Sequence, residues 1–323
     1  MWSLPELVEV GEGPQLGLEE VLYGNDTIAF LVVKGDELVY ERYYQCHSSE
    51  SLSQAFSANK SITSALVGMA IQDGYLHSVE QRVTDWVPEL LGRGFENVTL
   101  EHLLTMRSGS TYVENDNPFG VHVLFNYTPD LEKMILDFRT AAEPGQGFKY
   151  KSGDTALLAL ALSRALAPQT ISGYLQERIW DPLGMEHDAV WTVDRDEGLE
   201  KSWCCLAATA RDFAKLGRLY LRRGEWNGQQ ILPSEWIERS TRGAFASEVW
   251  DEDFRAAGLQ NYGYSWWLAS DEEGDYLALG KDGQYIYVNP AADTLIVRLG
   301  WSQGDLPTSQ WLRLFQFLSS SGG

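Results

Sequence analysis

Strand-like segments stand at both ends of this chain, and helix-like segments fill its middle. Residues 27–44 read TIAFLVV, then KGDE with its Gly-Asp turn, then LVYERYY, which is the pattern of a β-hairpin. Residues 262–299 hold four further runs rich in aromatic and β-branched residues. This order predicts an α+β fold: an antiparallel sheet built from both ends is flanked by helices, and a helical region is inserted between its two halves.

Apolar periodicity predicts where the helices lie. A long helix is expected from Ser57 to Gly74, and Thr99 and Thr209 have the sequence context of helix N-caps. The other expected helices cover residues 99–106, 129–138, 152–167, 169–180, 209–221 and 308–318, and the late strands cover 262–269, 276–279, 284–289 and 294–299. We predict one domain over residues 1–323, with its sheet drawn roughly from 20–55 and 260–323 and its helical region roughly from 57–225.

Composition argues against several classes of partner and location. With 46 acidic and 25 basic residues, the net charge of −21 disfavours nucleic acid and anionic membranes. No segment approaches the roughly 20 apolar residues of a membrane span, and the first residues lack a secretory signal. Among Cys46, Cys204 and Cys205, adjacent cysteines rarely bridge each other, and an odd total leaves at least one thiol unpaired. We therefore expect a cytoplasmic protein in a reducing compartment.

Missing motifs narrow the chemistry further. The five histidines are scattered without a metal-ligand spacing, so no metal is expected. The chain has no G-x-S-x-G elbow and no P-loop, so neither an α/β-hydrolase site nor a nucleotide cofactor has support. We expect no cofactor, and the sequence leaves the oligomeric state open.

The segment Ser57-Ala-Asn-Lys60 is the only S-x-x-K in the chain. Residues three apart on a helix share one face, so both side chains would point into the same space. A buried lysine with a lowered pKa can take the proton of a serine hydroxyl and make the serine a nucleophile. The alternative is an N-capping serine beside a surface lysine.

The segment Tyr150-Lys-Ser152 stands between a Pro-Gly-Gln-Gly loop and an apolar helix. A phenol held near a cation can relay a proton to a leaving group. Taken alone, the segment favours the other interpretation, a loop tyrosine that packs on the start of the helix with Ser152 as its N-cap.

The segment Lys281-Asp282-Gly283-Gln284 leads into the strand-like run QYIYV. Gly283 would let a ligand lie close against the strand. The backbone amide of Gln284, together with that of Ser57, would form an oxyanion hole. Taken alone, the segment is a plain Asp-Gly hairpin turn.

In the order S-x-x-K, Y-x-S and K-x-G, the three segments resemble the serine β-lactamase-related family, whose penicillin-recognising members share S-x-x-K and a later K-T-G element. The likeness is greatest to the class C-like branch, with its carboxylesterases, D-aminopeptidase-type peptidases and 6-aminohexanoate-dimer hydrolases. It extends from residue 27 over nearly the whole chain, through FSANKSITSALVGMAIQDG, HLLTMRSG, PGQGFKYKSGDTALLALAL, DPLGM, LAATARDFAKLGRLYLRRG and GKDGQYIYVNP. The resemblance implies a single catalytic domain with the site between the sheet and the helical region.

The resemblance also implies roles by position. Ser57 matches the nucleophile, Lys60 its base and Tyr150 the proton-shuttling tyrosine. Lys281 matches the first residue of the K-T-G or H-x-G element, and Gln284 with Ser57 supplies the oxyanion amides.

Two positions depart from the family pattern. Ser152 stands where many β-lactamases have asparagine, and a serine hydroxyl lacks the amide fork that recognises an acylamino side chain. Asp282 stands where the K-T-G threonine would be, and a carboxylate facing the pocket would repel a substrate carboxylate. Both departures favour neutral esters or amides over penicillins.

The stretch 112–127, YVENDNPFGVHVLFNY, is irregular and aromatic in sequence. This suits a lip over the pocket, with Tyr112 in contact with substrate. An ordered loop packed on the core is weighed equally.

We therefore predict a serine hydrolase that cleaves a small-molecule ester or amide through an acyl-enzyme on Ser57. One alternative is a β-lactamase or D-amino-acid peptidase of the same fold. Another, from a different class, is a catalytically idle protein that binds an acyl ligand or serves in protein interactions.

Overall fold

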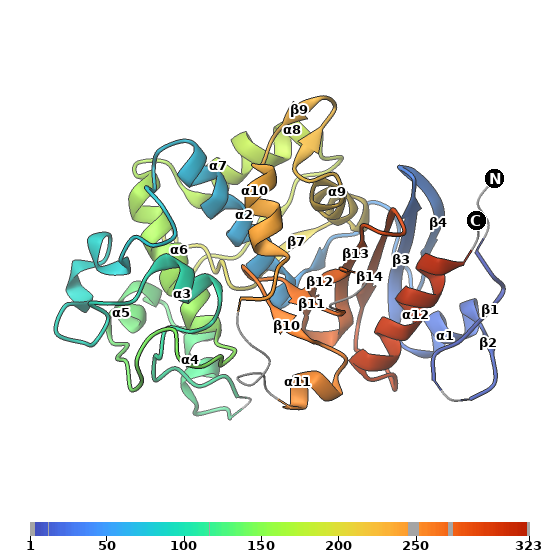
Figure 1. Cartoon of the computed structure of the whole chain (residues 1–323), viewed down its shortest axis with the longest axis horizontal. Helices are drawn as coiled ribbons and strands as arrows, with labels where there is room; N and C mark the ends of the chain where they lie inside the picture. Colours follow the sequence, from blue (N-terminus) through green and yellow to red (C-terminus); the bar gives the residue numbers. More distant parts are fainter. Residues whose placement is uncertain (1–3, 12, 116, 245–251, 271–273, 322–323) are drawn as a thin grey trace.

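A seven-stranded antiparallel sheet forms the centre of the molecule (Figure 1), in a computed structural model that describes residues 4–11, 13–115, 117–244, 252–270 and 274–321. The strand order is β10-β11-β12-β13-β14-β3-β4. The strands are β3 (Thr27–Lys34), β4 (Glu37–Tyr43), β10 (Asn261–Tyr262), β11 (Trp267–Leu268), β12 (Tyr276–Gly280), β13 (Gln284–Asn289) and β14 (Thr294–Gly300). Because β14 pairs with β3, with Ile296 opposite Val32, the prediction of one sheet built from both ends is confirmed.

Helices cover both faces of this sheet. Alternate residues of β14 point to opposite faces, so Leu295 and Val297 join the core shared with α2 (Asn59–Gln72) and α9 (Ala210–Leu221). Ile296 points the other way, into the core shared with α1 (Leu18–Gly24) and α12 (Thr308–Ser320). The predicted α+β class, with helices flanking an antiparallel sheet, is confirmed.

A mostly helical region lies beside the sheet, with α2 between the two (Figure 1). Its centre is the buried helix α6 (Ser152–Leu166), which packs on α2, α3, α5 and α7. The region contains α3 (Leu100–Leu104), α4 (Val121–Tyr127), α5 (Leu131–Leu136), α7 (Ile171–Leu175) with a π-helical turn at Gln176–Trp180, and α8 (Asp181–Leu183). Within the described ranges, no helix combines a bilayer-spanning length with enough hydrophobicity.

Shorter strands and helices are also present in the described ranges. Three small sheets are formed by β1 (Leu7–Val8) with β2 (Leu16–Gly17), by β5 (Ser53–Gln54) with β7 (Leu206–Ala208) and β6 (Val190–Trp191), and by β8 (Glu225–Trp226) with β9 (Gln229–Gln230). Two further helices, α10 (Ser234–Ser240) and α11 (Glu252–Ala256), precede β10. The predicted N-caps are confirmed, since Thr99 accepts from the backbone N–H of His102 and Thr209 from that of Asp212.

Two predicted segments differ from the structure. Residues 262–269 do not form one strand, because Ser265 has φ of +63° and turns the chain back between β10 and β11. Residues 112–127 are not wholly irregular, because helix α4 occupies their second half. Strand propensity does not predict the turn at Ser265, and a loop-like composition does not predict helix α4.

The prediction for the cysteines is wrong in one respect. Cys204 and Cys205 are joined by a disulfide, whereas Cys46 is free and exposed. Cys205 has φ of +72°, a left-handed backbone conformation that brings the two neighbouring sulfur atoms together. The cysteine pattern therefore gives no support for a reducing compartment.

Candidate active site

Ser57 lies in the short 3₁₀ helix η1 (Phe56–Ala58), which runs directly into α2. The α-helix thus begins two residues later than predicted, and Ser57 occupies the turn before it. Phe56 has φ of +45°, an uncommon conformation for a bulky side chain. The N–H of Ala55 donates to the carbonyl of Leu206 over 2.9 Å, so β7 anchors the turn that carries Ser57.

Lys60 lies on the first turn of α2 and contacts Ser57. Its Nζ atom donates to the Oγ atom of Ser57 over 2.8 Å and to the carbonyl oxygen of Trp203 over 3.1 Å. Only 1% of the residue is exposed. Burial lowers the pKa of Lys60 to about 8, and the negative charge of Glu114 acts in the opposite direction. A neutral amine is therefore accessible close to physiological pH.

Tyr150 also lies close to the amine of Lys60. The Nζ atom of Lys60 stands 4.9 Å from the centre of the Tyr150 ring, which stacks on Trp267 at 5.3 Å. Burial raises the pKa of Tyr150 well above its ordinary value, while a hydrogen bond with the Ser57 side chain acts against that rise. The phenol therefore keeps its proton near neutral pH and lies close enough to Ser57 for that side chain to influence its pKa.

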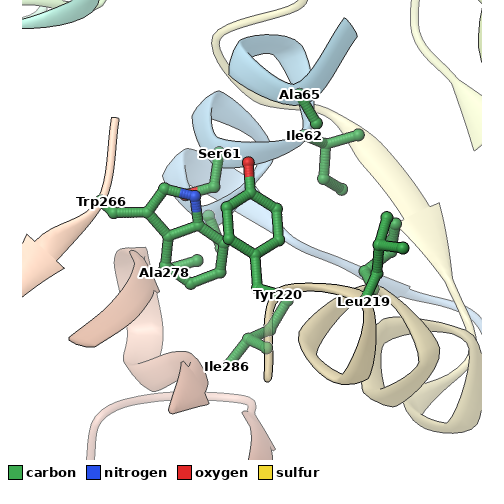
Figure 2. A pocket seen from close by; sticks show the side chains of 10 residues that line it. Ser61, Ile62, Ala65, Leu219, Tyr220, Trp266, Ala278 and Ile286 are labelled. Carbon is green, nitrogen blue, oxygen red and sulfur yellow. The ribbon is translucent and has the colours of Figure 1, made fainter. Parts of the chain in front are cut away.

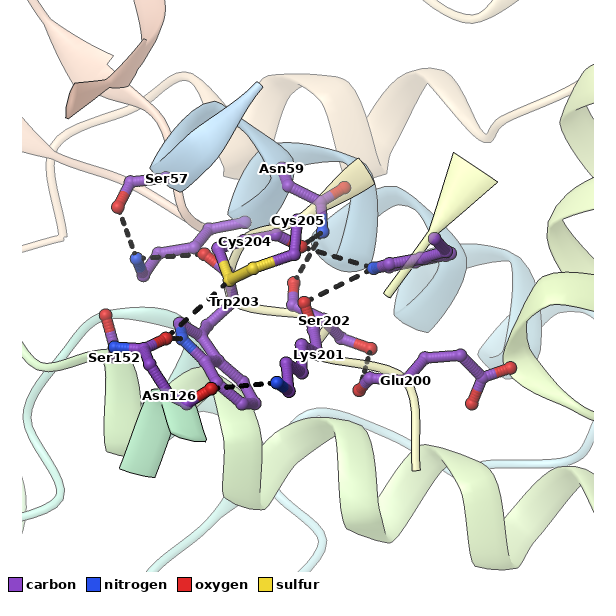
Figure 3. The surroundings of a disulfide bond; sticks show 12 residues. Ser57, Asn59, Asn126, Ser152, Glu200, Lys201, Ser202, Trp203, Cys204 and Cys205 are labelled. Carbon is purple, nitrogen blue, oxygen red and sulfur yellow. Dashed lines mark hydrogen bonds between the residues drawn. A yellow bond between two sulfur atoms is a disulfide. The ribbon is translucent and has the colours of Figure 1, made fainter. Parts of the chain in front are cut away.

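Asn59 lies next to residues 202–205, the segment that contains the disulfide (Figure 3), and the backbone of this segment also contacts Lys60. Asn59 donates to the carbonyls of Ser202 and Cys204 over 2.9 and 2.8 Å, next to the Trp203 carbonyl that accepts from Lys60. The sequence gives no signal for this support, because any residue type can supply a carbonyl oxygen.

Glu114 is a site residue that the sequence analysis missed. Its carboxylate accepts from the backbone N–H and the hydroxyl of Ser152, both over 2.7 Å. The Nδ1 atom of His122 lies 3.5 Å away. The glutamate falls within the predicted lip segment, where it is one of two acidic residues, with Asp116, among aromatic residues, and the sequence does not single it out.

Tyr112 is buried rather than open to the pocket. Its hydroxyl lies 2.8 Å from Nδ1 of His122, and its ring packs on Phe125. Gly153 gives the ring room, since a Cβ atom there would stand 2.6 Å from it. Tyr112 thus supports the start of α6 from behind Ser152.

The turn Lys281–Gly283 joins β12 to β13, and both of these strands contact the η1 turn that carries Ser57. Asp282 and Gly283 have φ of +62° and +74°, as the Asp-Gly pair leads one to expect. A Cβ atom on Gly280 would stand only 2.1 Å from the carbonyl oxygen of Ala55, so β12 approaches the Ser57 turn closely. Lys281 is exposed, Asp282 is partly exposed and Gln284 is buried.

A separate cavity lies behind the Ser57 turn, between α2, α9 and the sheet (Figure 2). Its volume of ≈ 10 Å³ holds at most one water molecule. Its lining is almost wholly apolar or aromatic and includes Ile62, Ala65, Leu219, Tyr220 and Trp266. It is therefore a packing defect and not a substrate site.

Among the described residues, no cluster of three or more His, Cys, Asp or Glu side chains has the arrangement of a metal site. The structure instead gathers Ser57, Lys60 and Tyr150 around one point, and strands β12 and β13 pack against the turn that carries Ser57. This is an arrangement suited to nucleophilic chemistry at a hydroxyl.

Comparison with known proteins gives concordant results. The chain matches the family model described as Beta-lactamase over residues 21–310. The 6-aminohexanoate-dimer hydrolase of Paenarthrobacter ureafaciens is 28% identical over 307 residues, covering 91% of this chain and 77% of that protein. A candidate 6-aminohexanoate-dimer hydrolase from Bacillus anthracis superposes with a TM-score of 0.82 at 26% identity, covering 98% of this chain and 84% of that one.

A more distant structure shares the fold. The octameric penicillin-binding protein homologue of Pyrococcus abyssi superposes with a TM-score of 0.69 at 21% identity, covering 91% of this chain and 74% of that one. The predicted likeness to the β-lactamase and penicillin-binding-protein fold is thus confirmed. Because the family model covers most of the chain, this protein belongs to the beta-lactamase family, as a hydrolase-type member.

Proposed function

We propose that this protein is a serine hydrolase that cleaves a small ester or amide through an acyl-enzyme on Ser57. The observation that carries the proposal is the 2.8 Å contact between the hydroxyl of Ser57 and the amine of Lys60. That amine has a pKa of about 8, so roughly a tenth of it is neutral at pH 7. The hydrolase activity named for the Paenarthrobacter relative supports a hydrolytic reaction.

Acylation begins when the Ser57 oxygen attacks the substrate carbonyl and Lys60 takes the hydroxyl proton. A carbon–oxygen bond forms, and the carbonyl electron pair moves onto the substrate oxygen. The backbone amides of Ser57 and Gln284 are the proposed donors to this oxyanion. Packing of β13 against η1 supports the pairing of these two amides.

Collapse of the intermediate expels the leaving group, which needs a proton. Tyr150 suits this transfer because its phenol stays protonated and lies beside Ser57 and Lys60. The proton that Lys60 accepted passes through Tyr150 to the leaving oxygen or nitrogen. Water then attacks the acyl carbon, its proton returns by the same groups, and the Ser57 oxygen leaves with a proton.

Charges around the site favour substrates without an anionic group. Glu114 contacts Ser152, and Asp282 lies on the turn beside Ser57, so both would repel a substrate carboxylate placed near them. The Ser152 hydroxyl already donates to Glu114 and offers no second donor to an acylamino side chain. These features support linear esters or amides over penicillins.

A substrate panel tests the proposal. Wild type and Ser57→Ala are assayed on p-nitrophenyl esters of increasing acyl length, on linear ω-amino-acid amides and on a chromogenic cephalosporin. A fluorophosphonate probe with intact-mass detection reports the reactive serine, and Ser48→Ala, a change at an exposed serine, is the control.

We expect wild type and Ser48→Ala to hydrolyse at least one ester or amide and to gain one probe mass. Ser57→Ala should do neither while keeping the wild-type melting temperature. Wild-type turnover by Ser57→Ala would refute the proposal. Efficient cephalosporin turnover would favour the β-lactamase alternative, and a folded wild type without turnover or adduct would favour the idle protein.

A further inference from the structure

Arg298 is a fully buried cation on β14 whose hydrogen-bond partners, within the described ranges, are all neutral. Its guanidinium donates to the carbonyls of Gly283 at 2.6 Å, Asp282 at 3.4 Å, Ser302 at 3.0 Å and Asn25, and to the Thr27 hydroxyl at 3.2 Å. Its central carbon lies 4.2 Å from the ring centre of Trp311 in α12. Burying a guanidinium is costly, and here main-chain dipoles offset that cost. An apolar side chain would fill this strand position at a lower desolvation cost. Stability alone therefore does not explain the arginine, and we looked for a role in the site.

Two of these carbonyls belong to the turn beside Ser57. Gly283 and Asp282 accept from the guanidinium, and the carbonyls of Lys281 and Asp282 accept from the side-chain amide of Gln284, each over 3.2 Å. The same amide is tied to the backbone of Gly300 on β14. Every carbonyl of the Lys281–Gly283 turn therefore has a hydrogen-bond donor from the Arg298 or Gln284 side chain.

The glycines around the guanidinium leave space for it. A Cβ atom on Gly283 would stand 1.9 Å from Nη1 of Arg298, and a Cβ atom on Gly300 would stand 2.5 Å from it. Gly283 also needs glycine for its φ of +74°. The turn and the guanidinium thus fit together as one unit.

The direction of the carbonyls sets the direction of the amides. In a planar trans peptide the C=O and N–H bonds point opposite ways. The Gly283 carbonyl points to Arg298, so the N–H of Gln284, in the same peptide unit, points away from it. Arg298 lies on the α12 face of the sheet, and η1 with Ser57 packs against β12 and β13 from the helical region.

We propose that Arg298 is a positioning residue, which fixes the 281–284 turn so that its amide groups meet the oxyanion formed on Ser57. This inference rests on the proposed serine-hydrolase function. The guanidinium acts through the backbone of the turn and does not touch substrate. It also polarises the Gly283–Gln284 peptide, since a hydrogen bond to a carbonyl strengthens the donor at the other end of that peptide.

The expected signature is a loss in the chemical step without loss of substrate binding. An oxyanion donor that is removed costs about 10²- to 10³-fold in kcat, and one that is loosened should cost about 10- to 100-fold. KM should stay within about threefold, because the ground-state carbonyl is bound mainly by other contacts. A purely structural residue would lower the amount of folded protein and leave kcat per active site unchanged.

The test uses Arg298→Met, Arg298→Lys and Gly283→Ala, with active sites counted by fluorophosphonate titration. Gly228→Ala is the matched control, because Gly228 also has positive φ, of +80°, but a methyl group there would meet no atom of the described chain within 4 Å. The affinity of phenylboronic acid, which forms a tetrahedral adduct with an activated serine, reports the oxyanion donors directly.

We expect kcat and boronate affinity to fall in parallel for Arg298→Met and Gly283→Ala, with Arg298→Lys between them and wild type. Gly228→Ala should match wild type in both. Wild-type kcat per active site in folded Arg298→Met overturns the positioning role. If Arg298→Met does not fold, wild-type kcat in Gly283→Ala overturns it instead. A wild-type enzyme without a Ser57 adduct would refute the hydrolase proposal itself, which is a different result.

Discussion

The amine of Lys60 lies 3.1 Å from the backbone carbonyl of Trp203, and this carbonyl is its second acceptor besides the Ser57 hydroxyl. A carboxylate at the same place would pair with the ammonium form and raise the pKa of Lys60. A peptide carbonyl holds the amine in position with only partial charge. This contact therefore combines a fixed geometry with a lysine whose pKa stays near 8.

The rate of ester hydrolysis should rise with pH through an apparent pKa of about 8. The ammonium form of Lys60 cannot accept the Ser57 proton, so kcat/KM should fall about tenfold per pH unit well below that pKa. Measurement of kcat/KM from pH 6 to 10 checks this. Lys60→Arg, which stays protonated, should lose at least about 100-fold at every pH. A flat wild-type profile from pH 6 to 9 would contradict the role of Lys60.

Glu114→Gln should move the acid limb of that profile to lower pH. The Glu114 carboxylate raises the pKa of Lys60, so its removal lets the pKa fall further and yields more neutral amine at pH 7. Loss of one acceptor for Ser152 should cost about 1 kcal/mol of unfolding free energy. Glu37→Gln, exposed on β4 at the far edge of the sheet, is the control and should leave the limb in place. A shift to higher pH in Glu114→Gln would show that the sign is wrong.

Tyr150→Phe should lower kcat by about 10²- to 10³-fold with little change in KM. The phenyl ring keeps its stacking on Trp267, so the melting temperature should change little. The loss should be larger for alkyl esters and anilides than for p-nitrophenyl esters, because a p-nitrophenolate leaves without a proton. Equal losses for both leaving-group classes would argue against proton transfer by Tyr150.

Gly280→Ala should damage the site by steric displacement alone. The new methyl would meet the carbonyl oxygen of Ala55, so β12 or the Ser57 turn must move, at a cost of about 1–3 kcal/mol. We expect activity to fall at least about tenfold in protein that still folds. Gly24→Ala, where the methyl would meet no described atom within 4 Å, should stay close to wild type. Thermal unfolding and ester turnover, measured together, decide the outcome.

Asn59→Ala should loosen the backbone that holds Lys60. The Ser202 and Cys204 carbonyls each lose one donor but keep another, from Thr63 and Trp191, so we expect about 1–2 kcal/mol of lost stability. Urea unfolding measures this. The exposed change Asn97→Ala should stay within about 0.5 kcal/mol of wild type, and an equal loss in both variants would remove the special role of Asn59.

Much of the fold was accessible from sequence because it depends on local patterns. Apolar periodicity gave α2, α6 and α9, and threonines followed by a helical run gave the caps at Thr99 and Thr209. The pairing of early with late strands followed from their order along the chain. The turn at Ser265 was not predicted, because a single residue in the left-handed conformation leaves no trace in the composition.

The contacts of the site likewise fall into local ones, which the sequence predicts, and long-range ones, which it does not. Ser57 and Lys60 are three residues apart, so helical geometry alone predicts their contact. The contacts of Trp203 with Lys60 and of Glu114 with Ser152 join residues 143 and 38 positions apart, and they depend on tertiary packing. The Cys204–Cys205 disulfide needed a backbone conformation that the sequence does not display.

The pairing of β3 with β14 affects when the nascent chain can complete its sheet during translation. Val32 and Ile296 are 264 positions apart (296 − 32), so a ribosome adding about 5–20 residues per second needs roughly 13–50 seconds to supply the partner of β3. Once residue 150 has been added, Ser57, Lys60 and Tyr150 are all present, but the Lys281–Gly283 turn starts only 131 positions later (281 − 150). Translation itself therefore postpones reactivity until the sheet closes, and a prematurely terminated chain would carry an exposed strand and no working hydrolase.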